Sequence, residues 1–203
     1  MPRPAKFDDD EILERAMHVF WRRGLSGASI RDLESELDLR APSIYRRFGS
    51  KEGLAAAVVQ RYVLEVIDGR IEKHLSGQGD PVSNVMGFLV SAVTPGPEED
   101  LLLGCLLTTI AMETDALPEP LARDVRFGLR RIDDALRAEV RRAAEEGRLA
   151  DGVVADDAAS TLSLVMQGLM ASARAGVGGE ELRRRARGAV EMVTQPSVSQ
   201  KTG

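Results

Sequence analysis

The chain has 203 residues, enough for a substantial hydrophobic core, and is 43% hydrophobic, 29% charged and only 4% aromatic. This composition is typical of packed helices, and the net charge of -5 argues against a nucleic-acid-binding surface spread over the whole protein. The single cysteine excludes an intrachain disulfide, and no apolar run reaches the roughly 18 to 20 residues of a membrane span or forms a signal peptide, so we expect a cytoplasmic protein that does not enter membranes.

Three helices are predicted in the first 50 residues. The first covers residues 8–24, where apolar residues recur at helical spacing after an acidic first turn and Gly24 provides a stop. Ser29 is a good N-cap for a second helix that ends near Asp38. Pro42 fits the first turn of a third helix, which ends at Phe48. The two short helices are therefore joined by a tight turn.

The rest of the chain is predicted to be helical as well. Ser50 caps a long linking helix that runs to about His74, and further helices are expected at residues 82–93, 100–114, 120–146, 156–175 and 180–193. No alternating strand pattern and no internal repeat is present. We predict an all-α protein of about nine helices, with a helical head at 1–50, a helical body at 51–194 and a disordered tail at 195–203.

Positive charge is concentrated near the N-terminus. Residues 15–51 contain eight basic and four acidic residues, whereas the chain after Tyr62 contains 16 basic and 22 acidic ones. In a helix-turn-helix the second helix lays its N-terminal residues against base edges in the major groove. The spacing predicts that Ile30, Leu33 and Leu37 of the second helix and Ile44 and Phe48 of the third face inward. The remaining residues of the third helix, most of which are polar, basic or aromatic, then face outward. Only this end of an acidic protein is expected to meet phosphate.

The run SIRDLESELDLRAPSIYRRFGSKEGL, from Ser29 to Leu54, and the preceding FWRRG resemble the TetR/AcrR family of transcriptional regulators. The resemblance covers about the first third of the chain strongly, and the body by its helix count and order. It implies that Tyr45 and Lys51 contact phosphates, with Ser29 and Arg31 in the same role, and that Arg46 contacts a base or a phosphate. It also implies that four residues enter the groove, namely Arg40, Ala41, Pro42 and Ser43. Arg40 is then suited to read guanine.

Three positions depart from the family pattern. Asp38 stands where the turn usually has glycine, and Arg40 stands where a capping serine or threonine is usual. Glu34 stands where the first helix of the motif, the bracing helix, usually has a small residue. Asp38 can adopt the left-handed conformation that the turn requires, whereas Glu34 must point outward or find a partner. Trp21 is interpreted as a packing residue between the head and the linking helix.

The last two predicted helices are apolar on more faces than one protomer needs. In the family these helices form a four-helix bundle with their copies, so the resemblance implies a homodimer on a roughly palindromic operator, with half-sites about 34 to 36 Å apart. The alternative is a buried pair of helices within one chain. The expected interface residues are Leu162, Val165, Met166, Leu169, Met170, Ala189, Val190 and Val193.

The resemblance also implies a cavity for a small effector between the linking helix and the last helix pair. Its expected lining is mainly apolar, which favours an apolar or weakly polar ligand, and consists of Met86, Leu89, Cys105, Thr108, Thr109, Met112, Phe127 and Gln167. For each of these residues, plain core packing is the alternative. Gly-Cys-Leu-Leu at Cys105 resembles members of the family whose cysteine senses electrophiles or oxidants, and a buried structural thiol is the alternative there.

No enzyme is indicated, because the chain has two histidines, one cysteine, no phosphate-binding glycine loop and no metal-spaced cluster. We therefore expect no catalytic residues, no metal and no cofactor. The sequence predicts a ligand-responsive repressor that binds double-stranded operator DNA. The alternatives are a repressor that senses through Cys105 and a helical ligand- or partner-binding protein that no longer reads DNA.

Overall fold

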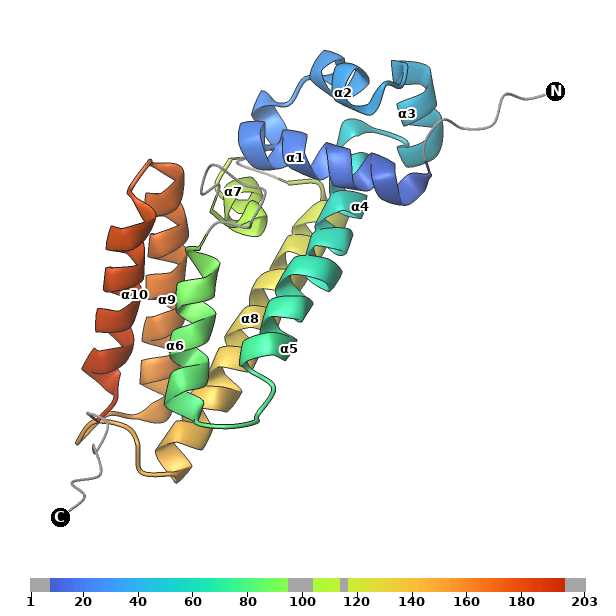
Figure 1. Cartoon of the computed structure of the whole chain (residues 1–203). Helices are drawn as coiled ribbons and strands as arrows, with labels where there is room; N and C mark the ends of the chain where they lie inside the picture. The colour runs from blue at the N-terminus through green and yellow to red at the C-terminus, as the bar shows by residue number, and fades with distance from the viewer. Residues whose placement is uncertain (1–7, 95–103, 114–116, 196–203) are drawn as a thin grey trace. The chain divides into compact units, whose positions relative to one another are not determined.

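The computed structural model describes residues 8–94, 104–113 and 117–195. Figure 1 shows the helices in chain order: α1 (Asp9–Gly27), α2 (Ile30–Leu37), α3 (Ala41–Phe48), α4 (Lys51–Tyr62), the π-helical turn η1 (Val63–Ile67), α5 (Asp68–His74), α6 (Pro81–Ala92), α7 (Leu106–Ala111), α8 (Glu119–Glu145), α9 (Ala155–Arg174) and α10 (Gly179–Val193). The helical backbone angles continue from α4 through η1 into α5, so these three form the long linking helix that the sequence predicts. In the described residues the only β-type pairing is an isolated bridge between Leu149 and Thr194. The all-α prediction is confirmed.

The chain forms two compact units. The first contains the described residues of Met1–Asp68 and Cys105–Leu129, and the second those of Gly69–Gly104 and Arg130–Gly203. The linking helix and α8 each contribute residues to both units. The expected disordered tail at 195–203 lies, apart from Gln195, outside the described residues.

The core of the first unit holds α1, α2, α3 and α4 together. Phe20 of α1, Leu33 of α2, Ile44 of α3 and Val58 of α4 are all fully buried. The ring of Trp21 packs edge-to-face on Tyr62 with centroids 5.4 Å apart, as predicted for a residue between the head and the linking helix. The helices of the head are therefore fixed to α4, the first part of the linking helix, by apolar and aromatic contacts.

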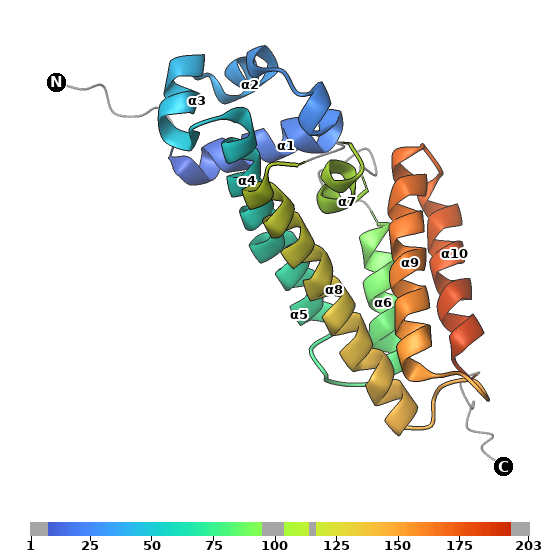
Figure 2. The ribbon, with the colours of Figure 1, turned by 180° about the vertical axis from the view of Figure 1, so that it is seen from behind.

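Helix α4 and the first part of α8 lie side by side in the same unit, as Figures 1 and 2 both show. The Nε2 of Gln60 donates a hydrogen bond of 2.8 Å to the Asp124 carboxylate. A Cβ atom at Gly128 of α8 would lie 2.7 Å from Val63 of η1, so the missing side chain permits α8 to pack closely on the linking helix.

In the second unit α6, α9 and α10 run side by side (Figures 1 and 2). Leu89 of α6, Leu162 of α9 and Val190 of α10 lie in their shared core. Arg141 of α8 makes two hydrogen bonds to Asp156 at the start of α9, at 2.9 and 3.1 Å. These contacts hold the second part of α8 to α9.

Two glycines change the predicted helix boundaries. Helical structure continues to Gly27 rather than ending at Gly24, but Gly24 has φ 71° and kinks the chain. The helix predicted at 100–114 is wrong where it includes Gly104 and Cys105, since Gly104 has φ 75° and α7 begins at Leu106. A Cβ atom at Gly104 would lie 2.7 Å from the carbonyl oxygen of Met170, so the close approach to α9 determines this backbone conformation. Residues 100–103 and 114 of that prediction lie outside the described residues.

Among the helices of the described ranges, none combines the length and the apolar character required to cross a membrane.

Candidate nucleic-acid interface

Helix α2 begins with a complete capping box. The Oγ of Ser29 accepts a 3.2 Å hydrogen bond from the backbone N–H of Asp32, and the Asp32 carboxylate accepts a 3.0 Å bond from the backbone N–H of Ser29. Hydrogen bonds from Ser29, together with the nearby Arg23 charge, hold the pKa of Asp32 below its ordinary value. Leu33 and Leu37 are fully buried on the inner face of α2. The bracing helix is thus fixed at its start and along its length.

The turn between α2 and α3 depends on Asp38. This residue has φ 49° and ψ 39°, the left-handed conformation predicted for it. The carbonyl oxygen of Glu34 accepts hydrogen bonds from the backbone N–H groups of Asp38 and Leu39, the second at 3.2 Å. The predicted helix-turn-helix is therefore present, with aspartate in the place of glycine.

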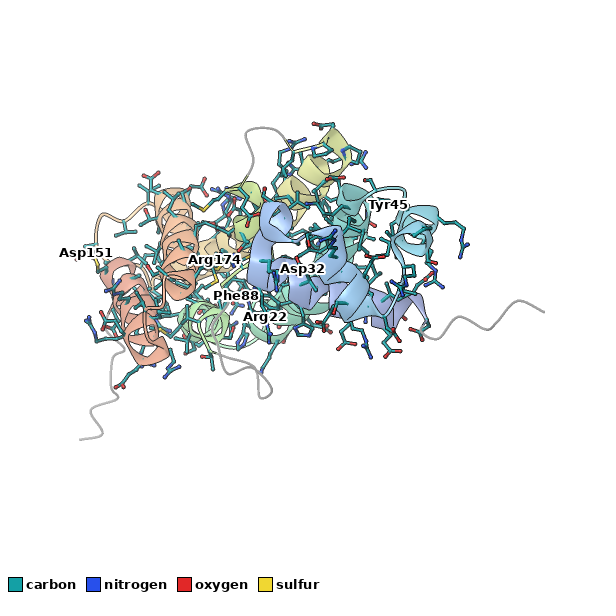
Figure 3. The ribbon with its side chains drawn as sticks, turned by 90° about the horizontal axis from the view of Figure 1, so that it is seen from above. Arg22, Asp32, Tyr45, Phe88, Asp151 and Arg174 are labelled. Atoms are coloured by element: carbon teal, nitrogen blue, oxygen red, sulfur yellow. The ribbon has the colours of Figure 1, made fainter. Side chains whose placement is uncertain are left out.

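Helix α3 is held by one fully buried side chain, Ile44, and exposes most of the rest. Arg40, Pro42, Tyr45 and Arg46 are all exposed, and the Tyr45 side chain, labelled in Figure 3, has 45% of its surface accessible. Ala41 and Ser43 are partly exposed. The residues expected to enter the groove thus occur together on one short helix and its N-cap.

The arginines of the head fall into two groups. Arg47 pairs with Asp9 at 3.0 Å and Arg23 pairs with Asp32 at 3.1 Å. Arg31, Arg40 and Arg46 are exposed and have no partner within the described part of the chain. These three guanidinium groups remain available to an anion, whereas the paired arginines brace the fold.

Lys51 has a structural role that the sequence did not indicate. Its Nζ donates to the carbonyl oxygens of Leu25 and Ala28, at 2.8 and 3.1 Å, and so ties α4 to the end of α1 and to its C-cap. An ammonium group has three donors, so one donor remains for a phosphate. The contacting residues are 23 and 26 positions apart in the sequence, so no local sequence pattern indicates this role of Lys51.

The residues predicted to bind a ligand are divided between the two units. Cys105, Thr108, Thr109, Met112 and Phe127 belong to the first, and Met86, Leu89 and Gln167 to the second. Leu89, Cys105 and Thr109 are buried, Met86, Thr108 and Gln167 are partly exposed, and Met112 and Phe127 are 75% and 52% exposed. Their role in binding stays a prediction.

Cys105 occupies the N-cap position of α7 and is 4% exposed. Its Sγ accepts a hydrogen bond from the Oη of Tyr62, with the two atoms 3.8 Å apart. The thiol is therefore packed against the linking helix within the first unit.

All eight predicted dimer residues belong to the second unit, and most of them are buried within it. Five of them are at most 4% exposed, namely Leu162, Met166, Leu169, Met170 and Val190, while Val165, Ala189 and Val193 are partly exposed. The outer face of α9 instead carries Leu164, which is 74% exposed, with Gly168 and Ala171. On α10, Met192 is 81% exposed. Helical periodicity located the apolar faces but did not distinguish the protomer core from the outer face.

In the parts of the chain that the structure describes, no group of three or more histidine, cysteine or carboxylate side chains could hold a metal ion.

The comparisons with known proteins agree with this architecture. Residues 12–58 match the family described as bacterial regulatory proteins, tetR family, and residues 83–190 match the tetracyclin repressor-like C-terminal domain. The HTH-type transcriptional repressor ComR of Escherichia coli (strain K12) is 27% identical over 185 residues, covering 89% of this chain and 86% of the relative.

Solved structures resemble nearly the whole chain. A cysteine mutant of the TetR family transcriptional regulator CifR, complexed with 26bp double-strand operator DNA, is 30% identical with a TM-score of 0.81, covering 93% of this chain and 98% of the other. A TetR family regulator from Agrobacterium tumefaciens is 26% identical with a TM-score of 0.79, covering 92% and 97%. These relatives are transcriptional regulators.

Proposed function

Because the chain belongs to the TetR family of bacterial regulatory proteins and is a DNA-binding transcriptional regulator, we propose that it represses transcription as a homodimer on a roughly palindromic operator. A small molecule that binds in its body releases it from that operator. Such a repressor acts where the chromosome is, in the bacterial cytoplasm. The observation that carries the proposal is α3, which is held by the buried Ile44 and exposes Arg40, Tyr45 and Arg46 in an otherwise acidic chain.

The proposed DNA contacts are of two kinds. Ser29, Arg31, Tyr45 and Lys51 contact phosphates, where hydroxyl groups, cations and the N-terminus of α4 suit an anion. The second kind is made by Arg40, Ala41, Pro42 and Ser43, which enter the major groove, with Arg46 at its edge. The first kind supplies affinity and orientation, and the second kind supplies sequence preference.

Binding to the DNA flanking the protein's own gene tests this proposal. Fluorescence anisotropy across a series of salt concentrations should show affinity falling steeply as counterions are released. Arg31→Gln should weaken binding to all sequences alike and reduce the salt slope by about 1. The matched control is Arg130→Gln, which removes an exposed arginine of the second unit that has no described partner. Absent or salt-independent binding would instead support a helical partner-binding protein that no longer reads DNA.

The proposed dimer uses the outer face of α9 and the end of α10. Leu164, Gly168 and Ala171 follow one another at helical spacing on α9, and a Cβ atom at Gly168 would meet nothing within 4 Å. An exposed apolar residue beside small ones permits close approach of a second copy. Met192 of α10 is a second exposed apolar side chain of the same unit.

The proposed response to a ligand is a shift between two dimer geometries. A ligand that binds better to the geometry that fits DNA poorly moves the population toward it and so relieves repression. The proposed lining residues are those predicted from the sequence, most of them apolar, which favours a small apolar or weakly polar effector.

Cys105 is the alternative sensor, and its burial beside Tyr62 favours the structural role. The two roles differ in one measurement, the release of operator DNA on treatment with a small electrophile. If Cys105→Ser releases DNA as the wild type does, the thiol is structural. If only the wild type responds, Cys105 is the sensor.

A further inference from the structure

The backbone N–H groups at the N-terminus of α3, the reading helix that is proposed to enter the major groove, are not capped by the side chain of its own N-cap residue. Its N-cap, Arg40, makes no side-chain capping hydrogen bond, because a guanidinium has no acceptor. Pro42 has no backbone N–H, and the N–H of Ser43 donates to the carbonyl oxygen of Arg40 at 2.8 Å. This leaves the N–H of Ala41, which donates to Oε1 of Glu34 at 2.7 Å. The cap of α3 is therefore supplied from α2.

Glu34 holds both sides of the turn. Its carbonyl oxygen accepts the N–H groups of Asp38 and Leu39 and so ends α2, while its carboxylate begins α3. The carboxylate also lies at the positive end of the α3 dipole, where a negative charge is favourable. One residue thus joins the end of the bracing helix to the start of the reading helix.

We propose that Glu34 and Arg40 form a compensating pair: Glu34 takes over the capping of α3, and this frees position 40 to carry an arginine that reads a base. Glu34 is then a positioning residue and Arg40 a specificity-determining one. The inference rests on the proposed operator binding. It explains two departures from the family pattern together. A serine or threonine at position 40 would hold the start of α3 through the N–H of Ser43, whereas Arg40 has no acceptor and leaves the start of α3 dependent on the hydrogen bond from Ala41 to Glu34.

Arg40 has the properties of a base-reading residue. It is exposed at the N-terminus of α3 and has no partner within the described part of the chain. Its planar fork can donate two parallel hydrogen bonds to O6 and N7 of guanine, which serine and threonine cannot do. The chemical preference expected at this position is a G·C pair in each half-site.

Thermal unfolding without DNA tests the capping step by itself. Glu34→Ala should lower Tm by about 2–4 °C, as expected for a lost helix cap in a chain of this size. In an Arg40→Ser background the new hydroxyl can cap the N–H of Ser43, so the same change should cost less than half as much. Glu34→Gln keeps an acceptor oxygen and should retain most of the stability. Glu36→Ala, an exposed change on the same helix, is the control. Equal losses in both backgrounds would overturn the compensating pair.

Operator selection from a random DNA library tests the reading step. After the wild type has selected a sequence, each base pair of a half-site is replaced in turn. Arg40→Ser should lose about 5- to 150-fold discrimination at one G·C pair per half-site, and Arg40→Lys should lose less, because an ammonium still donates to guanine without the planar fork. Glu34→Ala should reduce discrimination at the same pair, and Glu34→Gln should restore it. If the wild type selects no sequence, the proposed function fails. If it selects one but the Arg40 variants keep its full base preference, the compensating pair fails.

Discussion

At the level of single residues, Gly24 is a position where the backbone conformation restricts which amino acid can occur. Its φ of 71° and ψ of 179° lie in a region that only glycine adopts readily. A Cβ atom there would lie 1.7 Å from Oε1 of Glu113, whose other carboxylate oxygen accepts the backbone N–H of Ser26 at 3.1 Å. Glu113 follows α7, so this contact couples α7 to the kink of α1 within the first unit.

We expect Gly24→Ala to destabilise the protein by about 1–3 kcal/mol, because alanine strains this backbone and displaces the Glu113 carboxylate. Gly27→Ala is the matched control, since its Cβ atom would approach nothing closer than 3.8 Å. Urea unfolding of the three proteins measures the difference. Equal stability of the two variants would show that the kink is not constrained in this way.

At the scale of elements, the start of α10 carries an exposed charge cluster. Glu181 accepts two hydrogen bonds from Arg184, at 2.8 and 2.7 Å, and one from Arg185 at 2.8 Å. Bonding to Arg184 first, and then to Arg185, lowers the pKa of Glu181 from 4.5 to about 2. The carboxylate also faces the positive end of the α10 dipole.

A lowered pKa in the folded state makes the contribution of Glu181 dependent on pH. It is present above the unfolded value of 4.5 and is lost as the pH falls toward about 2. The Tm advantage of the wild type over Glu181→Gln should therefore be present at pH 6 and vanish near pH 2. Salt should reduce it, because the cluster is exposed. Glu180→Gln, which removes a neighbouring acid without a described arginine contact, is the control. An advantage that does not change with pH would contradict the assignment.

At the scale of the whole molecule, the proposed dimer determines whether two reading helices can meet two half-sites. We expect Leu164→Arg to produce monomers and to weaken operator binding, because it places a charge on the outer face of α9. Leu64→Arg is the control, since Leu64 is 69% exposed but belongs to the first unit. Sedimentation and DNA binding of both variants are the measurements. A dimeric Leu164→Arg protein would exclude this face as the interface.

Features that depend on local interactions could be predicted from the amino-acid sequence. The N-caps at Ser29 and Ser50, the left-handed Asp38 and the apolar spacing of α2 and α3 all lie within a few residues of the groups they act on. Local propensity and periodicity are therefore enough to identify the helix-turn-helix.

Other features depend on contacts between residues that are distant in the sequence and could not be predicted from it. Glu34 reaches Ala41 across the turn, Lys51 reaches carbonyl groups 23 and 26 residues away, and Gly104 meets the carbonyl of Met170. The fold also separates the buried Leu162 from the exposed Leu164, although both are leucines of one apolar helix. Such contacts depend on how the helices pack. The spacing of residues in the sequence shows which of them share a helix face, but not which residue of another element lies against that face. Burial and capping are satisfied by whichever group the fold brings near a residue, and that group need not be close in the sequence.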